Sequence, residues 1–232
     1  MQLLWEGITG AVRLLVERDP LVAAAAWRSL WISGCAVSLA GVLGVAIGSL
    51  LARIRFCGRG AVLVLFRVGM SVPTVLIGLF GYAVLSRRGP LGGLELLYTP
   101  WAIIAGEFFL ALPIIVTWTH SSVAGLDPRV AGTALTLGAG PLRRWQTYLS
   151  EARLGIALAL LTAFARCFTE LGIAMMVGGN VKYRTRTLTT ATALETARGE
   201  FERGMAMSLI LLCMALVVTV FIAWIGRQEA ET

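Results

Sequence analysis

Residues 29–52, SLWISGCAVSLAGVLGVAIGSLLA, form a run of 24 residues without a charged side chain. Arg28 and Arg53 bound the run on either side. A helix rises about 1.5 Å per residue, so a run of this length is enough to cross a hydrocarbon core about 30 Å thick. The stretch therefore predicts a membrane-spanning helix.

Four more apolar runs follow along the chain. They are residues 68–86, 96–119, 154–177 and 204–226, each 19 to 24 residues long. Only three charged residues interrupt them, namely Glu107, Arg166 and Glu170. The sequence thus predicts five spans and an all-α integral membrane protein.

The composition agrees with this class and excludes others. Hydrophobic residues make up 57% of the 232 residues and charged residues 14%, against roughly 25% charge in soluble domains. A soluble fold could not cover so much apolar surface, and a disordered chain has the opposite composition. The net charge of +7 lies on no polar basic domain, so nucleic-acid binding is excluded.

The sequence offers few residues that could act in catalysis or bind a metal. The single histidine, His120, precedes Ser121 and Ser122, but neighbouring residues on a helix point apart, which argues against a catalytic dyad. The four cysteines form no CxxC pair. We therefore expect no catalytic residue and no metal site.

The N-terminal segment differs from the spans. Apolar side chains recur there at helical spacing, at Leu4, Ile8, Val12 and Leu15. The segment lacks the basic start and continuous apolar core of a signal peptide. The pattern predicts an amphipathic helix over residues 1–26, followed by a transmembrane domain over residues 27–228.

Glycines and prolines mark special positions within the spans. Gly34, Gly41 and Gly48 repeat every seven residues in the first span, and Gly44 with Gly48 forms a GxxxG pair. Small residues on one face let helix backbones approach closely in lipid, so these glycines predict helix packing.

Two prolines and one glycine-rich triplet are candidates for a gate or hinge. Pro73 and Pro113 lie inside the second and third spans, and Gly178, Gly179 and Asn180 follow the fourth. Proline frees backbone groups and bends helices, which marks either a hinge of a transport path or a packing bend.

A polar stretch of about thirty residues, 120–153, separates the third and fourth spans. Within it, residues 128–151 read as helix, turn, helix, with the turn at LGAGP, residues 137–141. This arrangement resembles the EAA coupling loop of type I ABC importer permeases. In that family a helix-turn-helix centred on a glycine docks into the partner ATPase, and Gly138 stands at the position of that glycine.

Longer blocks are similar to one branch of these permeases, the TupB-like tungstate permeases, which are kin to molybdate permeases. The blocks are SVPTVLIGLFGYAVLSRRGPLG (71–92), LLYTPWAIIAGEFFLALPI (96–114), LTLGAG (135–140), LSEARLGIALAL (149–160) and FTELGIAMMVGGNVKYRTRTLTTATALETARGEFERGMAMSL (168–209). They occur in the family's order and cover most of residues 27–226.

The resemblance implies a MetI-like bundle that works as a homodimer in the prokaryotic cytoplasmic membrane. It implies two partners, a cytoplasmic ABC ATPase dimer and an extracytoplasmic oxyanion-binding protein. The ATPase would contact the coupling loop, about residues 128–151, at Ala134, Leu137, Gly138, Ala139 and Glu151. ATP and Mg²⁺ would be used by the ATPase, so this chain would bind no cofactor and would not be an enzyme. The expected cargo is tungstate or a related oxyanion such as molybdate.

The orientation implied by the resemblance conflicts with charge counting. A cytoplasmic 120–153 loop puts the 53–59 loop and the C-terminus in the cytoplasm as well. Eight basic residues then lie on the cytoplasmic side and ten on the external side. The positive-inside rule does not support this orientation, although a basic external mouth would attract anions.

The external loop over residues 178–203 has the composition of an anion route. It contains both basic and hydroxyl-bearing side chains, at Lys182, Arg184, Thr185, Arg186, Thr189 and Thr190. A tetrahedral dianion needs positive charge and several hydrogen-bond donors. The alternative is a solvated basic loop with helix-capping threonines.

Charge inside the membrane is costly and is usually paired. Arg166 and Glu170 stand four residues apart on one helix face, so we expect an ion pair between them, with Glu107 as a further member. Direct contact of Arg166 with substrate is the alternative.

Two other functions stay open, an ion-coupled secondary transporter and a permease for another anion. Five spans cannot divide into two equal inverted repeats, which argues against the first. The chain also has no Walker A motif, because its only lysine, Lys182, follows Val181 where that motif has glycine. ATP hydrolysis is therefore expected in a separate subunit.

Overall fold

The computed structural model describes residue 5, residues 8–10 and residues 20–230, and this part of the chain contains helices and no strands. The predicted amphipathic helix over residues 1–26 lies largely outside the described residues. Its last part belongs to the first long helix, α2 (Pro20–Arg53). Residues 20–26 are therefore continuous with the first span, and the division into an N-terminal helix and a transmembrane domain stays a prediction.

Ten further elements follow α2. They are α3 (Arg59–Gly69), α4 (Thr74–Leu85), the 3₁₀ helix η1 (Gly92–Leu94), α5 (Pro100–Ala124), α6 (Pro128–Thr136), α7 (Pro141–Glu151), α8 (Arg153–Phe168), α9 (Gly172–Gly178), α10 (Leu188–Ala197) and α11 (Phe201–Ala230).

Three helices are each long and apolar enough to cross a membrane: α2, α5 and the Phe201–Phe221 part of α11. Two helix pairs meet the same criterion only together, and both are bent. The angle is 97° between α3 and α4, and 67° between α7 and α8. The predicted count of five spans is reached when each bent pair is one span.

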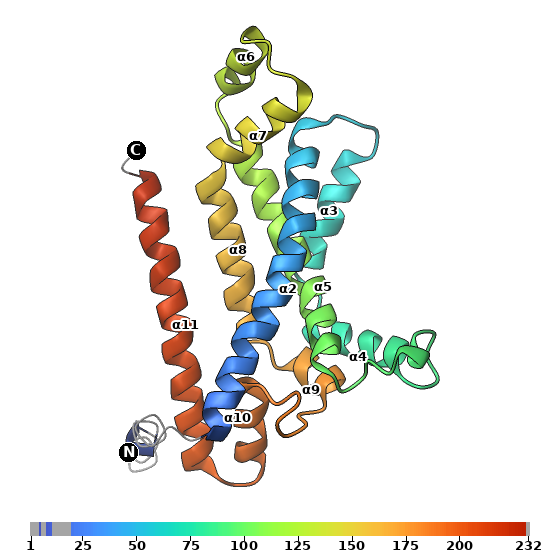
Figure 1. Cartoon of the computed structure of the whole chain (residues 1–232), viewed down its shortest axis with the longest axis vertical. Helices are drawn as coiled ribbons and strands as arrows, with labels where there is room; N and C mark the ends of the chain where they lie inside the picture. Colours follow the sequence, from blue (N-terminus) through green and yellow to red (C-terminus); the bar gives the residue numbers. More distant parts are fainter. Residues whose placement is uncertain (1–4, 6–7, 11–19, 231–232) are drawn as a thin grey trace.

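The second predicted span is not one straight helix. The apolar run over residues 68–86 contains the break between α3 and α4, where Pro73 lies just before α4 with an extended ψ of 129°. Proline has no backbone N–H to continue the hydrogen bonds of helix α3. It also disfavours the helical conformation of the residue before it. Helix α3 therefore lies along α5, and α4, which also contacts α5, turns across the bundle (Figure 1).

The fourth predicted span, residues 154–177, is also broken. Helix α8 ends at Phe168, and the chain turns before the short helix α9. Pro113, the other proline considered as a hinge, does not interrupt its helix, because α5 continues through it to Ala124.

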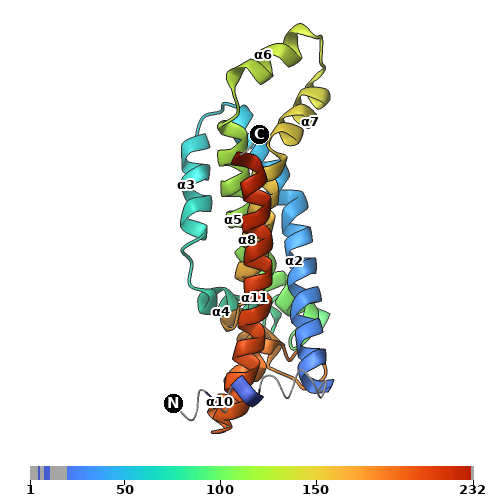
Figure 2. The same cartoon turned by 90° about the vertical axis from the view of Figure 1, so that its left-hand side faces the viewer.

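The chain rises and falls between two ends of the bundle. Helix α2 runs to the end that carries α6 and α7, α3 returns, α5 runs forward again, α8 returns, and α11 runs forward last (Figures 1 and 2). We call the end with α6 and α7 the hairpin end. The connection between α2 and α3 lies there too, whereas α9, α10 and the 86–99 connection lie toward the opposite end (Figure 1).

The core lies where α2 packs along α5, with α8 and α9 completing it. A Cβ atom added at Gly48 would lie 2.7 Å from the Val116 carbonyl oxygen, and one at Gly44 would lie 2.8 Å from Ile115 Cγ2. The predicted close packing at the GxxxG pair is confirmed. Gly34 has no atom within 4 Å of that position, so the seven-residue repeat does not form one contact face.

Candidate functional site

The predicted helix-turn-helix over residues 128–151 is confirmed, and it projects beyond the bundle as α6 and α7 (Figure 1). Asp127 caps α6 by accepting a hydrogen bond from the Arg129 amide at 2.7 Å. The turn depends on Gly138, whose φ is +71°, a conformation that costs other L-residues about 1 kcal/mol or more. The Ala139 amide then donates to the Ala134 carbonyl at 3.0 Å and closes the turn.

The hairpin encloses a cleft of about 760 Å³. All five residues expected to contact the ATPase line it, namely Ala134, Leu137, Gly138, Ala139 and Glu151. Leu137 is 80% exposed and Leu142, at the start of α7, is 65% exposed. Exposed apolar side chains around a cleft are typical of a surface that packs against another protein.

Four side chains that the sequence interpretation missed join the hairpin to the bundle. The Trp145 indole N–H donates to Ser49 Oγ on α2 at 2.9 Å. The Arg53 guanidinium lies 4.2 Å above the centre of the Tyr148 ring, and its Nη2 donates to the Val123 carbonyl of α5 at 2.9 Å. A displacement of α7 would therefore be transmitted directly to α2 and α5.

The threonines of the candidate anion route are structural. Thr185 is fully buried, donates to the Gly178 carbonyl at 2.6 Å and accepts from the Val181 amide at 2.9 Å. Thr187 and Thr190 form a capping box at the start of α10.

Thr189 is buried as well, and it donates to the Glu170 carbonyl at 2.9 Å. The expectation that Thr185, Thr189 and Thr190 face an anion is corrected here, because internal hydrogen bonds occupy their buried hydroxyls. These side chains fix the shape of the loop and of the start of α10.

The three basic residues of that loop make different contacts. Arg186 is partly buried, and its Nε donates to Asn180 Oδ1 at 3.1 Å, while its carbonyl accepts from Arg28 Nε at 2.8 Å. Lys182 lies over the Tyr183 ring at 5.1 Å. Arg184 is exposed and lines a pocket at this end of the bundle.

The glycine-rich triplet forms a tight turn after α9. Gly179 and Asn180 have φ values of +65° and +50°. A Cβ at Gly178 would lie 2.7 Å from Ile103 Cδ1, and one at Gly179 would lie 2.5 Å from Tyr98 Cδ1. Close packing and positive φ therefore explain the glycines, and movement at this turn stays a prediction.

The predicted ion pair between Arg166 and Glu170 is confirmed, with Nη1 and Oε2 2.7 Å apart. The Glu170 side chain is only 3% exposed, and its Oε1 accepts from the amides of Gly172 and Ile173 at the start of α9. Glu107 is buried nearby on α5 but forms no ion pair with a described residue. The pair thus joins α8 to α9 across the break in the fourth predicted span.

A helical membrane bundle with an anchored helix-turn-helix beyond one end has the form of an importer's membrane subunit. The solved structure of the MetNI methionine ABC transporter, in inward-facing conformations, has this fold. It matches at a TM-score of 0.71 and 17% identity, over 90% of this chain and 98% of that chain.

The chain belongs to the family of binding-protein-dependent transport system inner membrane components, whose pattern matches residues 44–229. A probable anion ABC transporter permease protein of Haloferax volcanii is 38% identical over 195 residues, 82% of this chain and 84% of the relative. The tungstate uptake system permease protein TupB of Campylobacter jejuni is 35% identical over 212 residues, 91% of this chain and 89% of the relative.

Proposed function

We propose that this chain is the permease subunit that imports tungstate, or a related tetrahedral oxyanion such as molybdate, across the prokaryotic cytoplasmic membrane. The names of the two relatives, an anion permease and a tungstate permease, support the cargo. The two ions share a shape and a double negative charge, so one path would accept both.

The anchored hairpin carries the proposal. Its cleft, its glycine turn and its exposed leucines form a surface for another protein, and Trp145 and Arg53 join that surface to α2 and α5. We place the hairpin end in the cytoplasm, against an ABC ATPase, and the opposite end toward an extracytoplasmic oxyanion-binding protein.

The working unit is a homodimer of this chain with two ATPase subunits. ATP and Mg²⁺ belong to the ATPase, and this chain supplies no catalytic group. Closure of the ATPase dimer would bring the two hairpins together, and the contacts of Trp145 and Arg53 would move α2 and α5 with them. The path would then alternate between openings at the two ends, with the bends at Pro73 and at Gly178–Asn180 as hinges.

Uptake into proteoliposomes tests this function. The chain is reconstituted with its ATPase and binding protein, and labelled tungstate uptake is measured with and without ATP, in competition with molybdate, sulfate and phosphate. We expect uptake that requires ATP and all three components, with molybdate as a competitor. Uptake driven by an ion gradient without the ATPase would contradict the proposal. If only sulfate or phosphate competed with tungstate, and molybdate did not, the path would be assigned to another anion.

A further inference from the structure

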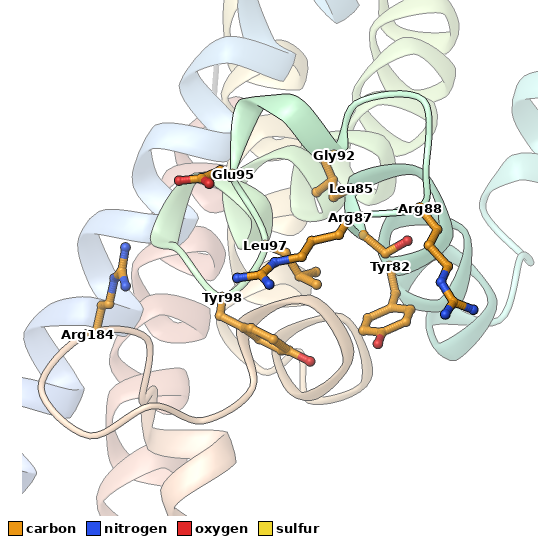
Figure 3. Close-up of a pocket in the computed structure, with 10 residues that line it drawn as sticks. Tyr82, Leu85, Arg87, Arg88, Gly92, Glu95, Leu97, Tyr98 and Arg184 are labelled. Carbon is orange, nitrogen blue, oxygen red and sulfur yellow. The ribbon is translucent and has the colours of Figure 1, made fainter.

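A pocket of about 770 Å³ lies at the end opposite the hairpin, between the 86–98 connection and the loop that follows α9. This volume is typical of small-ligand sites. Its polar lining comes from segments far apart in the sequence, as Figure 3 shows, and includes Tyr82, Arg87, Arg88, Glu95, Tyr98 and Arg184. We call this the mouth pocket.

The mouth pocket is strongly basic. Its lining contains three arginines, Arg87, Arg88 and Arg184, and one acidic residue, Glu95. No described acidic residue forms an ion pair with any of the three arginines. Figure 3 shows Arg87 reaching over the pocket on the side of Tyr98, with Arg88 beside Tyr82. Their N–H donors are therefore available to a ligand.

Tyr98 locks the two sides of the pocket together. Its amide donates to the Val177 carbonyl at 2.9 Å, and its φ of +60° turns the chain toward α9. Its ring packs so closely on Gly179 that a Cβ there would lie 2.5 Å from Tyr98 Cδ1. The buried Thr185 fixes the loop directly beside Arg184. The arginines thus stand on backbone segments that are already fixed relative to each other.

The backbone beneath Arg87 and Arg88 is equally constrained. The Gly89 amide donates to the Ser86 carbonyl at 2.7 Å, and the Leu91 amide donates to the Val84 carbonyl at 3.0 Å. A Cβ at Gly92 would overlap the Ser86 carbonyl oxygen. This tight turn presents two arginines at a defined position, which lowers the ordering cost of binding.

We propose that the mouth pocket binds the oxyanion outside the bundle, between its release from the binding protein and its entry into the path. The inference rests on the proposed function and adds a site to it. A tetrahedral dianion accepts hydrogen bonds on four oxygens, and a guanidinium donates two parallel N–H bonds to such a group. The pocket is larger than the bare ion, so the ion binds with part of its hydration water.

The tyrosines complete the donor set. A phenol with an ordinary pKa of about 10 is protonated at neutral pH. Desolvation, and after it the neighbouring Tyr82, raise the pKa of Tyr98 further in the same direction. Three positive charges at one mouth also raise the local anion concentration, within a screening distance of about 8 Å at physiological salt. Hydrogen bonds to the oxyanion and the positive electrostatic field that attracts it therefore act at the same pocket.

The test uses the assembled permease–ATPase complex in lipid nanodiscs, without binding protein. Labelled molybdate and tungstate are the probes, and binding is measured at equilibrium. We compare the parent with Arg87→Gln/Arg88→Gln/Arg184→Gln and with the corresponding triple lysine variant. Arg203→Gln is the control, because Arg203 is an exposed arginine at the start of α11 that does not line the pocket.

The parent should bind both probes, and the glutamine variant should bind them about tenfold or more weakly, since it loses three charge-assisted donors. The lysine variant, which keeps charge but loses the paired donors, should lie between them, and Arg203→Gln should match the parent. Equal binding by parent and glutamine variant, or no binding by the parent, overturns the proposal.

A second measurement separates the pocket from a protein-docking surface. Association of the oxyanion-loaded binding protein with the same complexes should stay within about twofold of the parent, a difference of about 0.4 kcal/mol. Loss of that association with unchanged probe binding would assign the arginines to the binding protein and overturn the proposal. ATP-driven uptake by the parent tests the proposed function separately, so the two ideas fail in different assays.

Discussion

The indole N–H of Trp145 on α7 donates to the hydroxyl of Ser49 on α2 at 2.9 Å, across 96 residues of sequence. Ser49 in turn donates to backbone carbonyls of its own helix, at Val45 and Ala46. The bond therefore fastens the hairpin to the last turns of α2. If it is broken, Ser49 keeps its bonds within α2.

Trp145→Phe should weaken coupling and leave the fold in place. The change removes one hydrogen bond, worth about 1 kcal/mol, and keeps an aromatic ring. We expect fewer oxyanions transported per ATP hydrolysed, with normal insertion into the membrane. Trp27→Phe, which alters an exposed tryptophan far from the hairpin, is the control. An unchanged ratio of transport to hydrolysis in Trp145→Phe would remove this contact from the coupling path.

Gly138→Asp should uncouple ATP hydrolysis from uptake. No atom lies within 4 Å of a Cβ at this position, so the isolated chain accommodates the side chain apart from about 1 kcal/mol of strain at φ +71°. The side chain projects into the surface proposed to meet the ATPase. Gly132→Asp on α6 is a matched control, because it has equal space but does not line the cleft. The prediction fails if both variants transport equally well.

Gly48→Ala should destabilise the packing of α2 on α5. Its Cβ would lie 2.7 Å from the Val116 carbonyl oxygen, so the helices must separate, at a cost of about 1–3 kcal/mol. Gly34→Ala meets no atom within 4 Å and should be neutral. Thermal unfolding in detergent compares the two. A similar Tm for both variants would show that the close approach is not needed.

Glu170→Gln should lower the Tm by removing the charge that faces Arg166. We expect a loss of about 1–2 kcal/mol, since Glu170 is buried but Arg166 is 43% exposed and partly solvated. The double variant Arg166→Gln/Glu170→Gln should recover part of the loss, because no unpaired charge remains. Additive effects of the two single variants would argue against the pair.

Apolar runs were enough to predict the all-helical membrane class. Each run is long enough, as a helix, to cross the hydrocarbon core of a membrane. The runs did not reveal the breaks at Pro73 and between Phe168 and Gly172, since apolar sequence lies on both sides of each break and Glu170 reads as one isolated charge inside a span. The hairpin turn was predictable from Gly138, because a local conformation there demands glycine.

The mouth was harder to predict from the sequence. Hydroxyl side chains at Thr185, Thr189 and Thr190 look alike whether they bind a ligand or cap a helix, and only their burial separates the two. Arg87 and Arg184 meet at one pocket because Tyr98 packs on Gly179, a contact between distant segments that no local pattern shows.

The central claim is that the two ends of the bundle face opposite compartments, with the hairpin inside and the arginine-bearing loops outside. Single cysteines at Gln146 and Tyr183, both exposed, test it in a background without the four native cysteines. An impermeant thiol reagent applied to intact cells should label the cysteine at 183 and spare the one at 146 until the membrane is opened. The reverse pattern would put the hairpin outside, agree with the count of basic residues, and contradict the account.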